Sequence, residues 1–422
     1  MQTVAVIGGG FAGMMTAYHL LESDDKNLEV ILFEPRDALG GLAYTTSDPY
    51  HLLNVPAGKM SALPNHPDDF QRWLIESEKE DSRSEAFVPR AWYGEYLRSR
   101  LNSAQRRSRV RFRRIRRPVT GLAKGWVVSM DGDSIPADMV VLALGYAARS
   151  GLDGLGLERP FQPHSWPLAA DQIAVVGTGL TGIDAALTAR RRYPKATIRM
   201  ISGSSNLPEI HGDGHHAQPV SELPKSLRGV TRWIRDQSPM VDWQDLFEAI
   251  RPRWNEIWEE LTLIEQRQFL RHLDRILNRY RHRVPAISAA RINEDLNIML
   301  EQGRVIGYQS GHSVTIRKQG GRVESIPVDF AIDASGPSFR YSQSDNPLLV
   351  SLRQDLGVPA GPHGLGLPTD KQGIVHGIPG LYAVGPLRRG TEWETTAVRE
   401  IRVQAADVAQ QIIKKSNSRY DR

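Results

Sequence analysis

The chain has 422 residues, of which 40% are hydrophobic and 24% charged, and it carries a formal net charge of +5. A single core stops growing at roughly 250–300 residues, so we expect two or three packed units. No apolar run reaches the roughly 20 residues of a membrane span, and no secretory signal pattern opens the chain, so we expect a cytoplasmic protein with no membrane contact. The absence of cysteine excludes disulfide frameworks, thiolate metal sites, iron–sulfur clusters and dithiol redox centres.

The first residues carry a nucleotide-binding pattern. An apolar run at 4–7 predicts a buried strand, and the string GGGFAG leads from it into a helical pattern at 14–21. In such a G-x-G-x-x-G turn, Gly8 permits the tight bend, Gly10 lets the backbone approach a pyrophosphate, and Gly13 lets the helix pack on the strand. The start of the helix would face the phosphate charge.

The following residues complete this pattern. Leu28–Phe33 predicts a second buried strand, and Glu34 after it suits the ribose hydroxyls of an adenosine. Because strand, glycines, helix and acidic end all agree, we favour a nucleotide site over a glycine turn that binds nothing. Arg36 and the glycine turn at 40–44 follow where a long cofactor such as FAD needs close backbone approach.

Two distant segments repeat a buried-strand pattern that ends in glycine. The first is an apolar run at 139–144 before Gly145, and the second lies at 380–386. The second leads to a predicted helix at 395–413, whose positive N-terminal end suits the negative charge of a reduced flavin. We therefore expect the FAD domain to be assembled from both ends of the chain.

A second glycine fingerprint lies in the middle of the chain. The strand Gln172–Val176 runs into GTGLTG at 177–182, followed by a helical pattern at 184–192 and a strand at 196–201. Two dinucleotide sites indicate that a nicotinamide cofactor delivers hydride to FAD, although a second lobe kept only for structure is the alternative. The stretch at 202–206, SGSSN, has neither the acid typical of NADH sites nor the arginine typical of NADPH sites, so both cofactors stay open.

A helical insertion interrupts the second lobe. Apolar and aromatic residues recur at helical spacing over 243–261 and 265–281, which predicts two amphipathic helices. Most of these side chains should form a core face, while the insertion as a whole could act as a lid over the flavin. The string RHR at 281–283 closes the run, either as cations at a helix C-terminus or as ligands of a nicotinamide phosphate or an anionic substrate.

Eight arginines lie between Arg106 and Arg117 and alternate with Val110 and Phe112. This predicts a half-buried edge strand with arginines on its wet side. The alternative is a docking face for an acidic carrier protein or a peptide; we do not expect nucleic-acid binding, because no recognition motif accompanies the charge. The string HGDGHH at 211–216 predicts a glycine-rich loop, and we expect no metal site there.

Several longer strings are more specific than the glycine fingerprints. They are HLLNVPAGKMS at 51–61, FVPR at 87–90, YGEYL at 93–97, GTGLT at 177–181 with Asp184, RHR at 281–283 with Pro285, GPLRRGT at 385–391 and WETTAV at 393–398. Along nearly the whole chain the sequence resembles the FAD/NAD(P)-binding flavoproteins that include bacterial FAD-dependent urate hydroxylase-like proteins, distant relatives of flavin N-hydroxylases and Baeyer–Villiger enzymes. That family often carries arginine within the stretch at 202–206, and this chain does not.

The resemblance and the motifs together give the expected site residues. The FAD contacts are Gly8, Gly10, Phe11, Ala12, Gly13, Glu34, Pro35, Arg36, Gly41, Leu42, Asn54, Met60, Val119, Gly145, Gly385, Thr395, Thr396 and Ala397. The NAD(P)H contacts are Gly177, Thr178, Gly179, Leu180, Thr181 and Gly182. The candidate catalytic residues are Asn54, His51 and His282.

We therefore predict an α/β fold with two Rossmann-like dinucleotide-binding domains of the three-layer ββα/βαβ type. The FAD-binding domain spans 1–160 and 334–422, the NAD(P)-binding domain spans 161–220 and 303–333, and a helical insertion or cap spans 221–302. The resemblance implies a class B flavin monooxygenase-like enzyme that uses FAD and NADPH or NADH and hydroxylates a small or carrier-bound substrate through a flavin peroxide. The alternatives are an FAD-dependent oxidoreductase without oxygen insertion and a flavin-based redox sensor or binding module.

Overall fold

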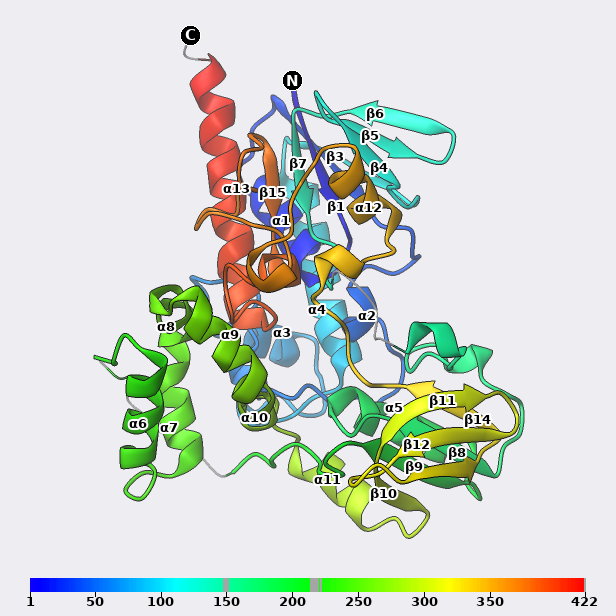
Figure 1. Cartoon of the computed structure of the whole chain (residues 1–422). Helices are drawn as coiled ribbons and strands as arrows, with labels where there is room; N and C mark the ends of the chain where they lie inside the picture. The colour runs from blue at the N-terminus through cyan, green and yellow to red at the C-terminus, as the bar shows by residue number, and fades with distance from the viewer. Residues whose placement is uncertain (147–151, 213–219, 221, 421–422) are drawn as a thin grey trace. The chain divides into compact units, whose positions relative to one another are not determined.

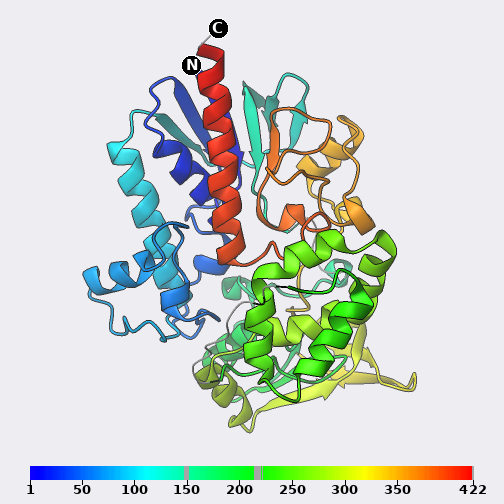
Figure 2. The same cartoon turned by 90° about the vertical axis from the view of Figure 1, so that its left-hand side faces the viewer.

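The computed structural model of the chain describes residues 1–146, 152–212, 220 and 222–420 (Figures 1 and 2). The chain divides into two compact units. The first unit contains residues 1–47, 55–148 and 339–422, and the second contains residues 48–54 and 149–338. Each unit is built on a parallel sheet, so the predicted α/β fold with two Rossmann-like domains is confirmed. The part of the chain described here contains no helix long and apolar enough to cross a membrane.

The first unit contains a five-stranded parallel sheet in the order β15-β7-β1-β2-β3. The central strands β2 and β7 are buried throughout and, apart from Glu29 in β2, are made of apolar residues, as expected for strands covered on both faces. Because β15 pairs with β7, the two ends of the chain share one sheet, as predicted. The strands are β1 (Gln2–Ile7), β2 (Leu28–Phe33), β3 (Arg111–Ile115), β7 (Met139–Leu142) and β15 (Leu381–Ala383).

Helices cover this sheet, and a small antiparallel sheet lies beside it. Helix α1 packs along α13, the long red helix near the C-terminus in both views (Figures 1 and 2). The predicted helix at 395–413 in fact begins three residues later and continues seven residues further, as α13. The helices are α1 (Phe11–Leu21), α2 (Gly41–Tyr44), α3 (Asp69–Glu76), α4 (Arg90–Arg107), α12 (Pro347–Gln354) and α13 (Val398–Tyr420), and the antiparallel strands are β4 (Gly121–Ala123), β5 (Val127–Met130) and β6 (Asp133–Pro136).

The second unit contains a four-stranded parallel sheet in the order β10-β9-β8-β14 and an antiparallel sheet in the order β11-β12-β13. The second part of the NAD(P)-binding domain was predicted to begin at residue 303, whereas the parallel sheet already resumes at Ile298 and the residues from Arg304 on lie in the antiparallel sheet. The elements are β8 (Gln172–Val176), α5 (Leu180–Arg192), β9 (Thr197–Ser202), α11 (Ala286–Asn293), β10 (Ile298–Gln302), β11 (Arg304–Gln309), β12 (Ser313–Arg317), β13 (Val323–Pro327) and β14 (Phe330–Asp333).

The helical insertion belongs to the second unit. The predicted helix at 243–261 is divided by a turn of 3-10 helix, Arg251–Arg253, where Pro252 cannot continue the α-helical hydrogen bonds. The predicted helix at 265–281 divides at Leu273 into two shorter helices. The helices are α6 (Leu227–Gln237), α7 (Trp243–Ile250), α8 (Trp254–Glu260), α9 (Leu263–His272) and α10 (Asp274–Arg281).

The aromatic residues of the insertion form its core. Trp254, Trp258 and Phe269 are buried, and the ring centroid of Phe269 lies 5.7 Å from that of Trp258. The core-face interpretation therefore holds for α7, α8 and α9. It does not extend to α10, which buries no residue and leaves Ile276 53% exposed.

His19 in α1 makes the stability of the first unit sensitive to acid. Burial lowers the pKa of His19 from 6.5 to about 4. Between these values the unfolded chain binds a proton that the folded chain does not, so the free energy of unfolding falls by up to about 3 kcal/mol as the pH drops from 6.5 to 4. Urea unfolding at several pH values measures this effect. In His19→Gln, the free energy of unfolding should no longer show this decrease between pH 6.5 and 4. His66→Gln, at an exposed position of the same unit, should keep it; equal slopes would contradict the assignment.

Candidate functional site

The glycines in the turn of the first unit are of two kinds, which differ in the space around them. Gly8 has a φ of +112°, and a Cβ there would lie 2.3 Å from the carbonyl oxygen of Ala143. A Cβ on Gly13 would lie 1.8 Å from the carbonyl oxygen of Gly8, so the turn and the helix can approach only without these side chains. At Gly10 the nearest atom to such a Cβ is 3.8 Å away, at Gly41. The fold itself requires Gly8 and Gly13, whereas Gly10 keeps space open at the start of α1.

Glu34 lies beside this turn, where β2 ends. It is 4% exposed, its Oε2 accepts a hydrogen bond of 2.8 Å from the Gly9 N–H, and its Oε1 accepts one of 3.0 Å from the Arg36 N–H. The Gly40 N–H donates to the Gly9 carbonyl at 2.9 Å, which brings the second glycine pair against the first. The carboxylate and the two glycine turns therefore meet at the carboxyl edge of the sheet, where α/β folds bind nucleotides.

The C-terminal segment reaches the same place. The Thr395 hydroxyl donates to the Gly385 carbonyl at 2.8 Å, and the Gly385 N–H donates to Gln404 Oε1 at 2.8 Å. A Cβ on Gly385 would lie 3.6 Å from the Cβ of Ala12, the second residue of α1. The start of α13 and the start of α1 are thus brought together, as a cofactor that spans both helix ends requires.

The other expected FAD contacts differ in exposure. Pro35 is exposed, Leu42 is 52% exposed, and Gly145 has a φ of +76° with open space around it. Phe11, Met60 and Val119 are buried, while Thr396 and Ala397 are half-buried before α13. The roles of these side chains toward FAD stay predictions.

The second unit repeats the geometry of the first glycine turn. Gly177 has a φ of +120°, and a Cβ there would lie 2.2 Å from the carbonyl oxygen of Ala334. A Cβ on Gly182 would lie 2.2 Å from the carbonyl oxygen of Gly177. No atom lies within 4 Å of the corresponding position on Gly179, the residue before α5. We call the open space at Gly10, at the start of α1, the first cradle, and the matching open space at Gly179, at the start of α5, the second cradle.

Ser202 occupies in the second unit the position that Glu34 occupies in the first. The Gly8 N–H donates to the carbonyl oxygen just before Glu34, and the Gly177 N–H donates to the one just before Ser202, each at 2.8 Å. The Ser202 hydroxyl lies 3.0 Å from the hydroxyl of Thr178 inside the glycine turn. The carboxylate at this position of the first unit is thus replaced by a hydroxyl in the second.

His51 belongs to a segment, residues 48–54, that packs on α5. Its Nε2 lies 2.8 Å from the Thr188 hydroxyl and 3.2 Å from the Asp184 carbonyl oxygen, and the ring is 3% exposed. Asp48 accepts a hydrogen bond from Thr188 and pairs with Arg191. These contacts fasten the segment to the helix, so His51 positions backbone, and a catalytic role for it stays a prediction.

The other two catalytic candidates have different surroundings. The Asn54 carbonyl oxygen lies 2.9 Å from Nε2 of His211, and Asn54 itself is half-buried. His282 follows α10, and its Nε2 lies 2.9 Å from a guanidinium nitrogen of Arg281. Asn54, His51 and His282 thus have different hydrogen-bond partners, and their catalytic roles stay predictions.

Arg283 is part of the packing of the insertion. Its guanidinium donates to Glu248 at 2.7 Å and lies over the Trp243 ring at 5.5 Å, and its side chain is 4% exposed. Burial lowers the pKa of Arg283, and the nearby Glu248 carboxylate opposes this shift. The interpretation of Arg283 as a ligand of a nicotinamide phosphate is therefore replaced by a structural one, because its donors are engaged inside the protein.

Arg283→Ala should lower the free energy of unfolding by about 3 kcal/mol, because it leaves the Glu248 carboxylate without its partner in a buried setting. The control is Arg271→Ala, which removes an exposed arginine from α9 of the same insertion. Urea unfolding should show a change below about 0.5 kcal/mol for the control. An Arg283 variant with unaltered stability and a raised KM for NADPH would restore the ligand interpretation.

The arginines between Arg106 and Arg117 form the expected edge strand. β3 lies at the edge of its sheet, with Arg111 and Arg113 exposed. Several of these side chains are engaged in ion pairs: Arg107 with Glu22, Arg109 with Asp24, Arg113 with Glu29, Arg116 with Asp37 and Arg117 with Asp133. This pairing reduces the charge available to a carrier protein or peptide, whose docking here stays a prediction.

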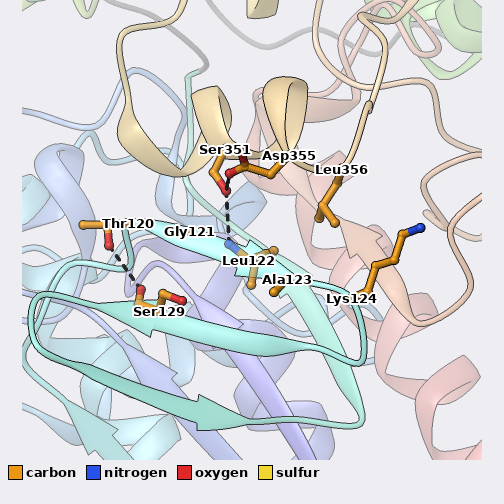
Figure 3. Close-up of a pocket in the computed structure, with 9 residues that line it drawn as sticks. All are labelled: Thr120, Gly121, Leu122, Ala123, Lys124, Ser129, Ser351, Asp355 and Leu356. Atoms are coloured by element: carbon orange, nitrogen blue, oxygen red, sulfur yellow. Dashed lines mark hydrogen bonds between the residues drawn. The ribbon is translucent and has the colours of Figure 1, made fainter.

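A pocket of about 400 Å³ in the first unit has none of the expected site residues in its lining (Figure 3). It opens between β4 and α12, where the Ser351 hydroxyl accepts a hydrogen bond of 3.4 Å from the Leu122 N–H and donates to Asp355. A Cβ on Gly121 would lie 3.2 Å from Ser351 Oγ, so α12 packs closely against β4 at this point. The pocket shows how α12 joins the small sheet and contains no residue of the nucleotide cradles.

The described residues contain no group of three or more His, Cys, Asp or Glu side chains that could hold a metal ion. For the loop at 211–216, this finding covers only two of the six residues. His211 and Gly212 are described, whereas residues 213–216 lie outside the described residues.

The chain matches a family model over its first third. Residues 5–147 match a model described as FAD-NAD(P)-binding, which covers the cradle at Gly10 and the carboxylate of Glu34. No curated protein matches the chain. The chain therefore contains an FAD/NAD(P)-binding domain, and the predicted cofactors FAD and NAD(P)H are confirmed. The narrower resemblance to urate hydroxylase-like proteins stays a prediction.

Solved structures with this fold span nearly the whole chain. The ornithine hydroxylase of Pseudomonas aeruginosa is 15% identical, with 98% of this chain and 99% of that one covered and a TM-score of 0.66. The ornithine N-hydroxylase of Kutzneria sp. 744, in a structure with reduced FAD, NADP+ and L-ornithine, is 14% identical at 98% and 99% coverage, with a TM-score of 0.65. Thioredoxin reductase of Lactococcus lactis is 14% identical at 98% coverage of both chains, with a TM-score of 0.54. At these identities the likeness is one of fold.

Proposed function

We propose that the protein is an FAD-dependent, NAD(P)H-using monooxygenase that hydroxylates a small organic substrate. The observation that carries the proposal is the same open cradle, at Gly10 and at Gly179, in two units of one cysteine-free chain. FAD bound at the first cradle supplies hydride acceptance from the nicotinamide and electron transfer to molecular oxygen.

The residues of the first unit fit FAD. The open space at Gly10 and the N-terminus of α1 suit a pyrophosphate, and the Glu34 carboxylate beside them suits the adenosine ribose. The backbone before α13, held by Thr395 and Gly385, suits the negative charge of the reduced ring system. The second cradle, at Gly179 and the start of α5, is assigned to the nicotinamide dinucleotide.

Two kinds of enzyme with this fold differ in their chemistry. A thioredoxin reductase passes electrons through a dithiol, and this chain has no cysteine with which to do so. A flavin hydroxylase needs no protein nucleophile, because the cofactor carries the reactive chemistry and the protein supplies a dry, shaped pocket. The two hydroxylases named above act on ornithine, so primary amines of basic amino acids are the first substrates to test.

The test uses the purified yellow holoprotein. Anaerobic NADPH or NADH should bleach the flavin absorbance at ordinary enzyme rates of roughly 1–10³ per second, and air should restore it. With ¹⁸O₂ and a panel of amines, including L-ornithine and L-lysine, one product should carry labelled oxygen. Anaerobic turnover with an artificial acceptor and no labelled product from a broad panel would favour an oxidoreductase without oxygen insertion. Flavin reduction far below enzyme rates would favour a redox sensor.

A further inference from the structure

We propose that the second nucleotide site selects NADPH over NADH, through Arg304 and Arg317 of the β11–β12 hairpin, which bind the adenosine 2′-phosphate. The proposal rests on the proposed function for the presence of a nicotinamide dinucleotide at Gly179. It assigns the phosphate-reading charge to strands that follow the helical insertion, far along the chain from the loop at 202–206.

The first step is the position of the ribose. In a dinucleotide fold the 2′-substituent lies at the end of the strand that follows the glycine helix, which here is Ser202. Thr178 inside the glycine turn lies beside the Ser202 hydroxyl, and the Gly303 N–H donates to the Ser202 carbonyl at 2.9 Å. Gln302 also donates to the Gly203 carbonyl at 3.3 Å. The ends of β9 and β10 therefore meet where the ribose would lie.

A cavity of about 390 Å³ opens at this junction. Its lining combines the strand ends with the basic hairpin: Gly203, Gln302, Gly303, Arg304, Arg317, Lys318 and Gln319. The cavity borders directly on the residue after Ser202 and is large enough for a phosphate group. Its only charged lining side chains are basic.

The charges of the hairpin are arranged for an anion. Arg304 and Arg317 are directly opposite each other in the antiparallel pair of β11 and β12, and both are exposed. Like charges opposite each other destabilise a strand pair unless a counter-charge lies between them. Neither guanidinium has a hydrogen-bond or ion-pair partner within the described part of the chain. Lys318 beside them is already paired with Glu301 and Glu324.

Two further features favour a phosphate at this place. Ser202 replaces the carboxylate that would repel it, and Ser202 and Gly203 leave no bulky side chain at the strand end. A guanidinium nitrogen of Arg275, from α10, lies 3.1 Å from the position of a Cβ on Gly203. Arg275 therefore adds positive charge beside the cavity from the helical insertion. Guanidinium groups suit phosphate because they donate paired hydrogen bonds.

The test compares the double variant Arg304→Ala/Arg317→Ala with the wild-type holoprotein. The matched control is Arg322→Ala, which removes an exposed arginine from the connection between β12 and β13, outside the cavity. Calorimetry measures the binding of adenosine 2′,5′-bisphosphate, adenosine 5′-monophosphate and inorganic phosphate, and stopped-flow measures flavin reduction by NADPH and by NADH. We expect the double variant to bind the bisphosphate and NADPH about 20-fold more weakly, with NADH unaffected. The control should match the wild type.

The outcomes separate the two proposals. Equal use of NADPH and NADH by the wild type, or equal losses in double variant and control, would overturn the selectivity proposal alone. Calorimetric binding of inorganic phosphate as tight as that of adenosine 2′,5′-bisphosphate would also overturn it, since the cavity would then be a general anion site. Failure of both nucleotides to reduce the flavin would count against the proposed function, while the calorimetry would still decide the binding of the 2′-phosphate. If the double variant folds poorly, Arg317→Gln alone should give a smaller loss in the same direction.

Discussion

Replacing Gly179 with alanine should slow the reduction of bound FAD by NADPH about 100-fold, with FAD content and Tm unchanged. The physical reason is that no atom of the protein lies within 4 Å of the added methyl group, so the fold accepts it. A dinucleotide that needs the backbone at this point would instead be displaced by about 1 Å, and such a displacement of reacting groups costs on the order of 10²-fold in rate. Stopped-flow absorbance under anaerobic conditions measures the effect.

The control for this prediction is Gly154→Ala. Gly154 lies in the same unit, also has open space around its Cβ position, and is not part of the glycine turn. Its variant should reduce at the wild-type rate. If Gly179→Ala also reduced at that rate, the second cradle would not hold the nicotinamide dinucleotide, and the lobe kept only for structure would become the better interpretation.

Gly13→Ala should lower the free energy of unfolding by about 3 kcal/mol and abolish FAD retention. The added Cβ would lie 1.8 Å from the Gly8 carbonyl oxygen, and because that atom belongs to backbone the helix itself must shift. Overpacking at a rigid contact costs typically 1–3 kcal/mol, and here it also displaces the turn that approaches the pyrophosphate. Urea unfolding and the ratio of flavin to protein absorbance measure the two effects.

Gly10→Ala is the matched variant for Gly13→Ala, because it should change FAD binding without changing the free energy of unfolding. Its Cβ meets nothing closer than 3.8 Å, so unfolding should stay within about 0.5 kcal/mol of wild type while FAD is still lost. Retention of a full complement of FAD by Gly10→Ala would show that the pyrophosphate does not use this space. The pair thus distinguishes a glycine that the fold needs from one that the ligand needs.

Buried parallel strands are the part of this fold that the sequence predicts best. Leu28–Phe33 and Gln172–Val176 agree with the observed strands, because a strand covered on both faces is made mostly of apolar residues. Glycine turns are equally readable, since their spacing follows from contacts within one strand, turn and helix. The break at Pro252 was also encoded, but the aromatic periodicity around it favoured one long helix.

Contacts between distant strands could not be predicted. The pairing of Arg304 with Arg317 depends on a hairpin register that follows from packing, so neither arginine stood out in the sequence. His51 did stand out in the sequence, but its hydrogen bond to Thr188 of α5 could not be predicted from it. For these three residues, the sequence does not show which side chains lie next to them in the folded protein.

The division of the first unit into three stretches of chain has a consequence for its synthesis. The fingerprint around Gly13 is made before most of the second unit, whereas β15 and α13, which complete its sheet and cover α1, are made after it. Domains generally fold as units during synthesis, so the second unit, complete by residue 338, can fold while the first still has an open sheet edge. A chain cut short after the second unit should therefore lose the cofactor site encoded at its beginning.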